Sequence, residues 1–370
     1  MANENLGAAR KAKNDEFYTQ FHDIEKEMNA YLEYDEDVFS GKTVLLPCDD
    51  PEWSNFTKYF AQNFERLGLK KLISTSYAPN SKPKDLNVQP TLFEIESPQF
   101  DESKTASNGK IFTLTRDTTG DNIINFDDLE WQYLEGDGDF RSAEISKLRD
   151  EADIIITNPP FSLFREFLGW IFETEKQFVI IGSMNAITYL EVFSLIKENK
   201  VWLGNGFSSG NAYFSSPSGS TYGSGVFDPS TGLVKFRNVV WYTNIDHGRR
   251  HQPLVLMSAA ENIKFSKHKE IKGIGYKKYD NFDAIDVPFI DAIPNDFEGL
   301  MGVPITFLGK HNPSQFEIIG SYNNGEHGEQ LGARKINVTS TGKTIYWNGP
   351  VVGGVPLYKR IVIRKRSAAE

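Results

Sequence analysis

An amide, two prolines and an aromatic ring follow one another at Asn158-Pro159-Pro160-Phe161, directly after the apolar run 154–156. Prolines cannot continue a strand ladder, so the segment could be merely a turn that ends a strand. Its residues could also activate an exocyclic amine, whose nitrogen lone pair is otherwise delocalised into a ring. The Asn158 side-chain oxygen and the Pro159 carbonyl can each accept one amine hydrogen, and Phe161 offers a stacking face for an extruded base. The segment predicts methylation of an amine such as adenine N6 by displacement from a sulfonium donor.

Short apolar runs alternate with helical patterns between residues 42 and 204, and these elements would position the segment. Asp50 as N-cap and Pro51 in the first turn predict where the first helix begins. The order predicts an α/β fold with a doubly wound, mostly parallel sheet, whose ligands bind at the carboxyl ends of the strands. Strands are expected at 43–47, 71–77, 153–157, 178–182 and 201–203, and helices at 51–67, 142–150, 162–172 and 188–197.

The later part of the chain is less regular. Residues 204–232 are rich in Ser and Gly and show no sustained period, so we expect a long loop that is a functional lid or a disordered insertion. Residues 235–245 predict one further strand. Because Gly, Pro and Asn interrupt the chain beyond it, we expect a catalytic domain at 1–247 and a smaller, less regular unit at 248–370.

The formal net charge of the 370 residues is −10, which argues against a nucleic-acid partner because phosphate binding depends on Lys and Arg. The charge is unevenly distributed, however. Residues 1–247 carry 23 basic and 38 acidic side chains, whereas residues 248–370 carry 17 and 12. The second unit is therefore basic, and its clusters could form a phosphate-binding surface, although any one cluster could be an ordinary solvated face. The candidates for DNA contacts are Arg249, Arg250, Lys277 and Lys278.

Composition excludes several classes of protein. No run of eighteen apolar residues and no signal peptide occur, so neither a membrane span nor export is expected. A single cysteine, Cys48, cannot form an internal disulfide, which fits the cytoplasm. Because the sequence contains no metal-binding motif, no metal is expected.

The segment at 158–161 resembles the Asp/Asn/Ser-Pro-Pro-Tyr/Phe signature of amino-group methyltransferases that use S-adenosylmethionine. Over most of its length the chain is similar, more narrowly, to the EcoRI-type adenine-specific DNA methyltransferases. The segments that carry this resemblance are Lys-Asn-Asp-Glu-Phe-Tyr-Thr-Gln at 13–20, Cys-Asp-Asp-Pro at 48–51, Gly-Asp-Gly-Asp-Phe-Arg-Ser at 136–142, residues 158–164, and Met-Gly-Val-Pro-Ile-Thr-Phe-Leu at 301–308.

The resemblance implies a Rossmann-like methyltransferase fold, S-adenosylmethionine as cofactor and a role for each matching residue. Phe17, Tyr18 and Thr19 would close over the methionine end of the cofactor, and Asp139 and Phe140 would flank its adenine. The turn after the first strand, formed by Pro47, Cys48, Asp49 and Asp50, would lie beside the cofactor. The sequence departs from the broad pattern there, because this turn has no Gly-x-Gly and the second strand has no acidic residue at its end.

The expected function is site-specific transfer of a methyl group to N6 of an adenine flipped out of duplex DNA, in restriction-modification. We expect a cytoplasmic monomer that forms no stable complex with a cognate restriction endonuclease. An RNA-adenine or protein-glutamine methyltransferase could use the same motif, because both substrates present a conjugated amino group. A catalytically inactive DNA-binding relative is the third alternative, favoured by the turn without glycine.

Overall fold

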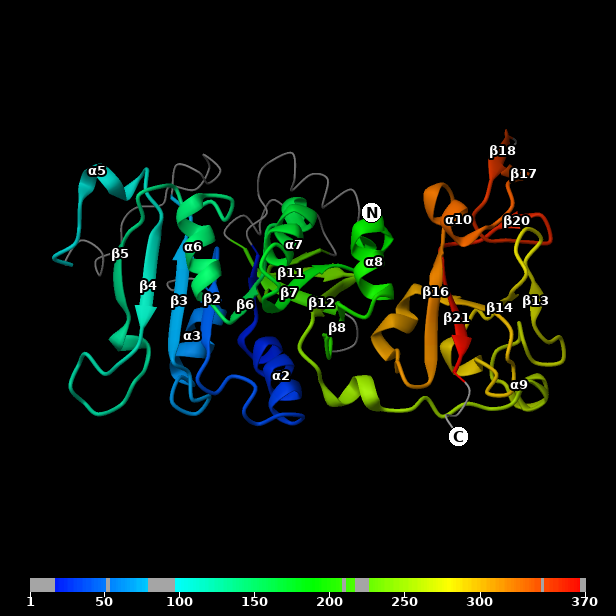
Figure 1. Cartoon of the computed structure of the whole chain (residues 1–370), viewed down its shortest axis with the longest axis horizontal. Helices are drawn as coiled ribbons and strands as arrows, with labels where there is room; N and C mark the ends of the chain where they lie inside the picture. The colour runs from blue at the N-terminus through cyan, green and yellow to red at the C-terminus, as the bar shows by residue number, and fades with distance from the viewer. Residues whose placement is uncertain are drawn as a thin grey trace. The chain divides into compact units, whose positions relative to one another are not determined.

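The computed structural model describes residues 17–50, 54–78, 97–207, 211–216, 226–340 and 343–366 (Figure 1). The described chain forms two compact units. Unit 1 contains the residues up to Ala186 together with Leu203–His247, and unit 2 contains Ile187–Trp202 together with the chain from Gly248 onward. The helix expected at 188–197 is therefore part of unit 2. The protein is a mixed α/β protein that contains several sheets.

A mixed eight-stranded sheet forms the centre of unit 1, in the order β5-β4-β3-β2-β6-β7-β12-β8. Its middle strands β3, β2, β6 and β7 are parallel, whereas β4, β5 and β12 are antiparallel to their neighbours. All residues of β2 and β6 are buried, as expected for strands covered on both faces. The strands are β2 (Thr43–Leu46), β3 (Lys71–Ser76), β4 (Lys110–Leu114), β5 (Glu130–Tyr133), β6 (Ile154–Thr157), β7 (Gln177–Ser183), β8 (Trp202–Leu203) and β12 (Val239–Thr243).

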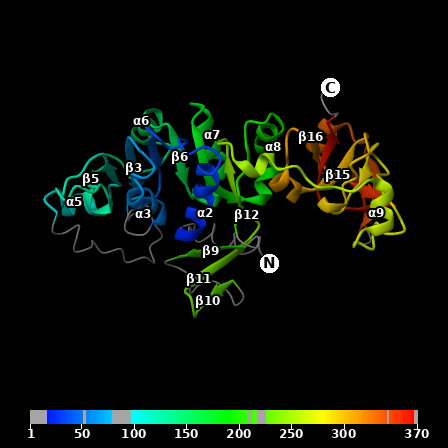
Figure 2. The ribbon, with the colours of Figure 1, turned by 90° about the horizontal axis from the view of Figure 1, so that it is seen from below.

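Helices cover both faces of this sheet, with α6 and α7 on one side and α2 and α3 on the other (Figure 2). The crossovers β2–α3–β3 and β6–α7–β7 confirm the strand-helix-strand order read from the sequence. The helical segments are α2 (Phe21–Leu32), α3 (Asn55–Gln62), α5 (Glu102–Thr105), η2 (Phe126–Asp128), α6 (Ala143–Glu151), η3 (Phe161–Leu163), α7 (Phe164–Phe172) and η4 (Met184–Thr188).

The predicted start of the first crossover helix was wrong. Ser54 is the N-cap of α3, because its hydroxyl oxygen accepts from the Phe56 N–H at 3.1 Å. Asp50 instead accepts the Ser54 N–H through its backbone carbonyl at 2.6 Å. Pro51, the expected first helical residue, lies outside the described residues.

Part of the region expected to be a loop at 204–232 forms strands. β9 (Asn211–Ser215), β10 (Phe227–Asp228) and β11 (Leu233–Arg237) join β1 (Tyr18–Thr19) in a small sheet with the order β1-β9-β11-β10. In β9 the buried residues Ala212 and Phe214 alternate with more exposed ones, so one face of the strand is buried. The Ser and Gly residues on either side made this alternation hard to recognise in the sequence. Residues 208–210 and 217–225 lie outside the described residues.

The single strand expected at 235–245 is two strands in two different sheets, β11 and β12. Asn238 separates them with a φ of +61°. Asn tolerates this left-handed conformation better than most residues, because its short polar side chain can form local hydrogen bonds. The turn at Asn238 therefore passes the chain from the small sheet to the large one.

Unit 2 contains a five-stranded sheet in the order β13-β14-β15-β21-β16 and two separate hairpins, β17–β18 and β19–β20. Helices α8 and α10 contact strand β16. Among the helices of the described residues, none has both the length and the apolar character needed to cross a bilayer. The strands are β13 (Lys277–Lys278), β14 (Ile285–Asp286), β15 (Met301–Pro304), β16 (Phe316–Tyr322), β17 (Ile336–Ser340), β18 (Lys343–Trp347), β19 (Val351–Val352), β20 (Val355–Pro356) and β21 (Arg360–Lys365). The helical segments are α8 (Leu190–Lys197), η7 (Gly248–His251), α9 (Ala259–Phe265), η8 (Ile290–Ala292), η9 (Ile305–Lys310) and α10 (Glu326–Leu331).

Candidate active site

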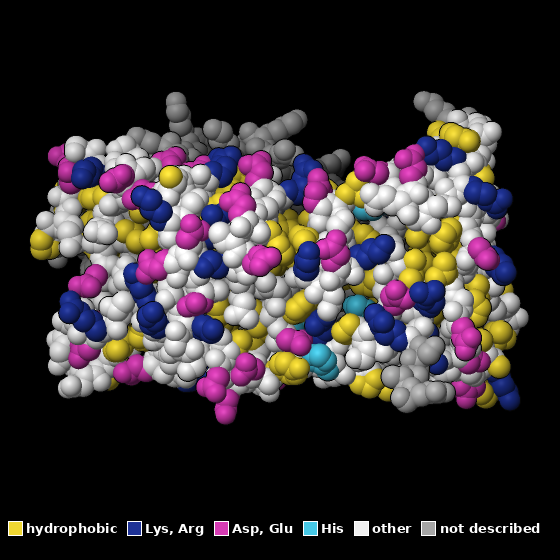
Figure 3. Space-filling view, viewed as in Figure 1, with side chains coloured by type: hydrophobic (Ala, Val, Ile, Leu, Met, Phe, Trp, Pro, Cys, Tyr) yellow, Lys and Arg dark blue, Asp and Glu magenta, His cyan; other side chains and the backbone are white. Residues whose placement is uncertain are grey.

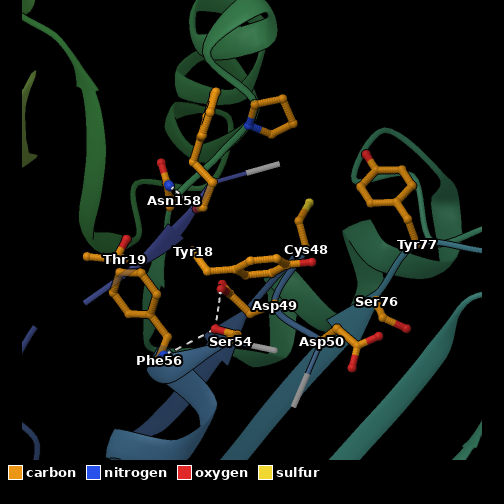
Figure 4. Close-up of a pocket in the computed structure, with 12 residues that line it drawn as sticks. Tyr18, Thr19, Cys48, Asp49, Asp50, Ser54, Phe56, Ser76, Tyr77 and Asn158 are labelled. Atoms are coloured by element: carbon orange, nitrogen blue, oxygen red, sulfur yellow. Dashed lines mark hydrogen bonds between the residues drawn. The ribbon is translucent and has the colours of Figure 1, made fainter. Parts of the chain in front are cut away.

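A pocket lies in unit 1 at the carboxyl ends of β2, β3 and β6. It brings together three segments that are far apart in the sequence, 17–19, 48–50 and 158–160. In Figure 4 the Tyr18 ring lies at the centre of the view, with Asn158 above it and Asp49 and Asp50 below it. The residues that line the pocket are Phe17, Tyr18, Thr19, Cys48, Asp49, Asp50, Ser54, Phe56, Ser76, Tyr77, Asn158 and Pro160.

The side chain of Asn158 is held in one orientation. Its Nδ2 donates to the Phe17 carbonyl oxygen at 2.6 Å, and a carbonyl can only accept, so this contact assigns the amide nitrogen and the amide oxygen. The Oδ1 atom is buried, and no donor reaches it from the part of the chain that the structure describes. A buried acceptor without a partner costs about 1–3 kcal/mol. The Asn158 Oδ1 atom is therefore suited to accept a hydrogen bond from a ligand.

Of the three residues after Asn158, Pro160 lines the pocket, whereas Pro159 and Phe161 do not. Pro159 is buried, and Pro160 lines the pocket with a φ of −53°. Phe161 is half-buried, and its ring centroid lies 6.0 Å from that of Phe17 and 6.3 Å from that of Phe236. One side of the Phe161 ring thus packs in an aromatic cluster, while the remainder of the ring is accessible.

Asp49 is a buried carboxyl group at the turn after β2. It accepts from the Ser54 hydroxyl at 2.7 Å, and its Oδ2 is hydrogen-bonded to the Thr157 hydroxyl oxygen at 2.6 Å. Burial raises the pKa of Asp49 to about 7, and its hydrogen bonds with Thr157 and Ser54 only partly offset this effect. Thr157 is the last residue of β6, so its contact with Asp49 joins the β2 turn to the Asn158 segment.

Cys48 explains how this turn forms without glycine. Its φ is +69°, in the left-handed region that L-residues other than Gly adopt at a cost of about 1–2 kcal/mol. Its N–H donates to the Thr75 hydroxyl at 3.4 Å, which helps to hold the turn against β3. Pro47 is buried and does not line the pocket, but its carbonyl oxygen accepts from Thr157 at 2.7 Å.

Comparisons with known proteins identify the family of this chain. The model of a family described as adenine-specific methyltransferase EcoRI matches residues 5–366. The chain belongs to this family.

Three relatives cover most of the chain. It is 43% identical over 320 residues to Type II methyltransferase M.EcoRI of Escherichia coli, covering 86% of this chain and 89% of the relative. It is 34% identical over 315 residues to Type II methyltransferase M.MpnI of Mycoplasma pneumoniae, covering 84% and 83%. It is 33% identical over 320 residues to Type II methyltransferase M.MgeORF184P of Mycoplasma genitalium, covering 84% of each chain. No solved structure matches the chain.

Two residues that the family resemblance assigns to the cofactor, Asp139 and Phe140, do not line the pocket. The Asp139 carboxylate accepts from the Arg141 side chain at 2.9 and 2.6 Å, and these hydrogen bonds hold the pKa of Asp139 below its ordinary value. The Phe140 ring is fully buried, with centroids 5.0 Å from Phe167 and 5.7 Å from Trp170. In this structure Asp139 forms an ion pair with Arg141, and Phe140 packs in the core of unit 1.

Four residues that line the pocket were not predicted: Ser54, Phe56, Ser76 and Tyr77. Ser76 ends β3 and Tyr77 follows it, so the rule that ligands meet the carboxyl ends of strands could have identified both. Burial raises the pKa of Tyr77, and the neighbouring Cys48 and Asp139 act in the same direction. The Tyr77 hydroxyl is therefore neutral at physiological pH and can serve as a hydrogen-bonding group.

The candidates for DNA contacts have different environments in unit 2. Lys277 and Lys278 are exposed on β13, and Arg249 is half-buried. Arg250 is only 7% exposed, its guanidinium lies 3.8 Å from the Trp202 ring centroid, and it donates to the Asn199 side-chain oxygen. The expectation that Arg250 contacts phosphate is therefore withdrawn, because its charged group is buried inside unit 2.

Proposed function

We propose that this adenine-specific methyltransferase transfers a methyl group from S-adenosylmethionine to N6 of an adenine flipped out of duplex DNA at a specific sequence. The observation that carries the proposal is the buried Oδ1 of Asn158, which no donor reaches within the described residues. An amine hydrogen of adenine is the kind of donor that this atom lacks. The Type II relatives support a role in restriction-modification.

The pocket residues fit S-adenosylmethionine in chemical character. When bound, this cofactor supplies a methyl group on a positively charged sulfur. Asp49 and Asp50 offer carboxyl groups to a cationic ligand, while Tyr18 and Phe56 offer aromatic surface. Thr19 Oγ1 is buried, and it has no hydrogen-bond partner among the residues described. We assign Phe17, Tyr18, Thr19, Cys48, Asp49 and Asp50 to the cofactor, with Pro47 supporting the turn through its carbonyl.

Asn158 and Pro159 perform the activation. The Asn158 oxygen accepts one N6 hydrogen and the Pro159 carbonyl accepts the other, which concentrates the lone pair on N6 for attack on the methyl carbon. No strong base is needed, because the proton can leave the nitrogen after the carbon-nitrogen bond forms. Preorganised acceptors of this kind typically contribute about 3 kcal/mol each to the lowering of a barrier. Pro160 restricts the backbone, and the accessible part of the Phe161 ring stacks on the base.

We infer a Rossmann-like, doubly wound catalytic domain at 1–247 and a target-recognition region at 248–370. Lys277, Lys278 and Arg249 are proposed to contact phosphates. Asp139 would accept from the cofactor's adenine once its ion pair with Arg141 opens, while the buried Phe140 ring would support this segment through its packing with Phe167 and Trp170. The enzyme would act as a monomer in the cytoplasm, beside a restriction endonuclease with which it forms no stable complex.

Sequencing of methylated adenines in DNA from cells that express this chain tests the proposal directly. We expect N6-methyladenine at one recognition sequence in cells with the wild-type chain, and a much smaller methylated fraction of that sequence in cells with Asn158→Ala. Purified chain with S-adenosylmethionine should methylate duplex DNA that contains that sequence, and should not methylate RNA or protein glutamine. Preferential modification of RNA or of glutamine would instead support one of the alternative methyltransferases.

A further inference from the structure

The hairpin β17–β18 in unit 2 has two faces of different character. The strands pair antiparallel, with Asn337 opposite Tyr346 and Thr339 opposite Thr344. Since side chains alternate between the faces of a strand, these four residues share one face. All four are exposed, and Tyr346 is 64% exposed. The opposite face carries Ile336, Val338, Ile345 and Trp347.

Val338, which is only 3% exposed, anchors the apolar face, whereas its cross-strand partner Ile345 is 38% exposed. The exposed face consists of one amide, two aliphatic hydroxyls and one phenol, and none of its four side chains carries a charge. The hydroxyl oxygens of Thr339 and Thr344 lie 3.3 Å apart, so they form one continuous polar row across the two strands. This face presents both donors and acceptors, as the recognition of base edges requires.

The chain around the hairpin is strongly basic. Residues 330–366 contain eight Lys and Arg residues and no Asp or Glu. Arg334, just before β17, donates to the backbone carbonyl of Asp280 at 3.1 Å, a neutral acceptor that leaves its positive charge in place. Three of the eight charges are partly balanced by ion pairs: Lys335 pairs with Glu329, Arg360 with Asp286 and Arg364 with Glu317. Figure 3 shows exposed hydrophobic and basic side chains next to one another at the end of unit 2 that carries this hairpin.

We propose that the β17–β18 hairpin enters the major groove of duplex DNA and that Asn337, Thr339, Thr344 and Tyr346 contact the base edges there. A two-stranded ribbon fits the B-DNA major groove, which is about 12 Å wide, whereas the deep and narrow major groove of A-form RNA does not admit it. Asn337 is suited to the paired donor and acceptor of adenine, and the threonine methyl groups to thymine. This inference rests on the proposed function and names the element that reads the duplex.

The experiment compares the full-length wild-type chain with the variants Asn337→Ala, Tyr346→Ala and the double variant Thr339→Ala with Thr344→Ala. The probes are a duplex that carries the sequence found methylated in cells and a duplex of equal length without it. An RNA duplex of the same sequence is the third probe. Tyr34→Ala is the matched control, because Tyr34 is a 48% exposed tyrosine in unit 1. Thermal unfolding and S-adenosylmethionine binding are measured for each variant.

We expect each hairpin variant to bind the specific duplex roughly ten- to hundredfold more weakly, since lost base contacts have effects of this size. Affinity for the duplex without the site should change by less than about twofold, and the control should match the wild type. If folded hairpin variants keep the wild-type ratio of the two affinities, the inference is wrong while the proposed function stands. Binding of the RNA duplex through the same residues would also overturn it. If the wild-type chain methylates no DNA adenine, the proposed function fails first and the inference fails with it.

Discussion

The hydroxyl oxygen of Thr157 lies 2.6 Å from Oδ2 of Asp49 and 2.7 Å from the carbonyl oxygen of Pro47. A hydroxyl has one hydrogen, so it cannot donate to both oxygens at once. A protonated Asp49 resolves this conflict, because the carboxyl group then donates to Thr157 while Thr157 donates to Pro47. The contact ties the ends of β2 and β6 together, and it agrees with the raised pKa of Asp49.

Asp49 should make stability depend on pH in a defined direction. In the folded chain its pKa is about 7, whereas an exposed aspartate ionises near pH 4. Protonated Asp49 therefore makes its full contribution to the unfolding free energy below about pH 4. This contribution is lost by about pH 7, because only the unfolded chain releases the proton between these values. Relative to Asp49→Asn, whose amide can still donate to Thr157, the wild type should lose roughly 4 kcal/mol of unfolding free energy across that window.

Urea unfolding of both proteins between about pH 5 and pH 8 covers most of this range. The unfolding free energy of the wild type minus that of Asp49→Asn should fall steadily as the pH rises to about 7 and then stay constant. A difference that is constant over the whole range would show that Asp49 ionises normally.

Asn158→Ala should lower the turnover number by roughly a hundred- to a thousandfold, because it removes the acceptor for one amine hydrogen. Asn63→Ala is a matched control, since the Asn63 Nδ2 also donates to a backbone carbonyl, that of Tyr59 at 2.8 Å, and does not line the pocket. Steady-state methylation of one duplex by both variants provides the comparison. Near-normal turnover of Asn158→Ala would remove the basis of the proposed chemistry.

Phe161→Ala should weaken capture of the flipped base more than cofactor binding. Base stacking on an aromatic side chain contributes roughly 1–3 kcal/mol, so we expect a loss of about ten- to hundredfold in the binding of an extruded base. A fluorescent adenine analogue at the target position reports extrusion, and calorimetry reports cofactor affinity. Phe161→Tyr retains the ring and should behave like the wild type; equal losses in both measurements for Phe161→Ala would argue against stacking.

Gly138→Ala should destabilise unit 1 by roughly 3 kcal/mol. Gly138 has a φ of +86°, and a Cβ there would lie 2.4 Å from the Ser76 carbonyl oxygen at the end of β3. Gly120→Ala is the matched control, because its φ is +82° and a Cβ would meet nothing within 4 Å. The control should lose only about 1 kcal/mol in the same denaturation measurement. Equal losses of unfolding free energy in the two variants would mean that the backbone around Gly138 and Ser76 shifts to accommodate the added Cβ without cost.

Basic residues of unit 2 should separate into two kinds. The double variant Lys277→Gln with Lys278→Gln should show a weaker dependence of DNA affinity on salt. The slope of log affinity against log salt concentration should become smaller in magnitude by about 2, because each phosphate contact contributes nearly one. Arg250→Gln should leave that slope unchanged and lower stability by about 1–3 kcal/mol, since it loses the contacts with Trp202 and Asn199. A slope that responds only to Arg250→Gln would reverse this assignment.

Local patterns in the sequence were sufficient for the central strands and crossovers of unit 1. The β-branched runs that became β2, β6 and β7 are buried on both faces, and such strands are recognisable without knowledge of their neighbours. β4, β9 and the division between β11 and β12 were missed. Each of these depends on pairing with a distant segment or on one residue, Asn238, whose conformation no periodic pattern reports.

The sequence by itself determined the Asn-Pro-Pro-Phe segment at Asn158 and its place at the carboxyl end of a parallel strand, because residue types and strand order are local properties. Only the tertiary structure decided which other side chains meet there. Tyr77 lines the pocket, whereas the Asp139 carboxylate is paired with Arg141 and the charge of Arg250 is buried over Trp202. The direction of a side chain and its partner depend on residues brought close by folding, and these contacts cannot be read from spacing along the chain.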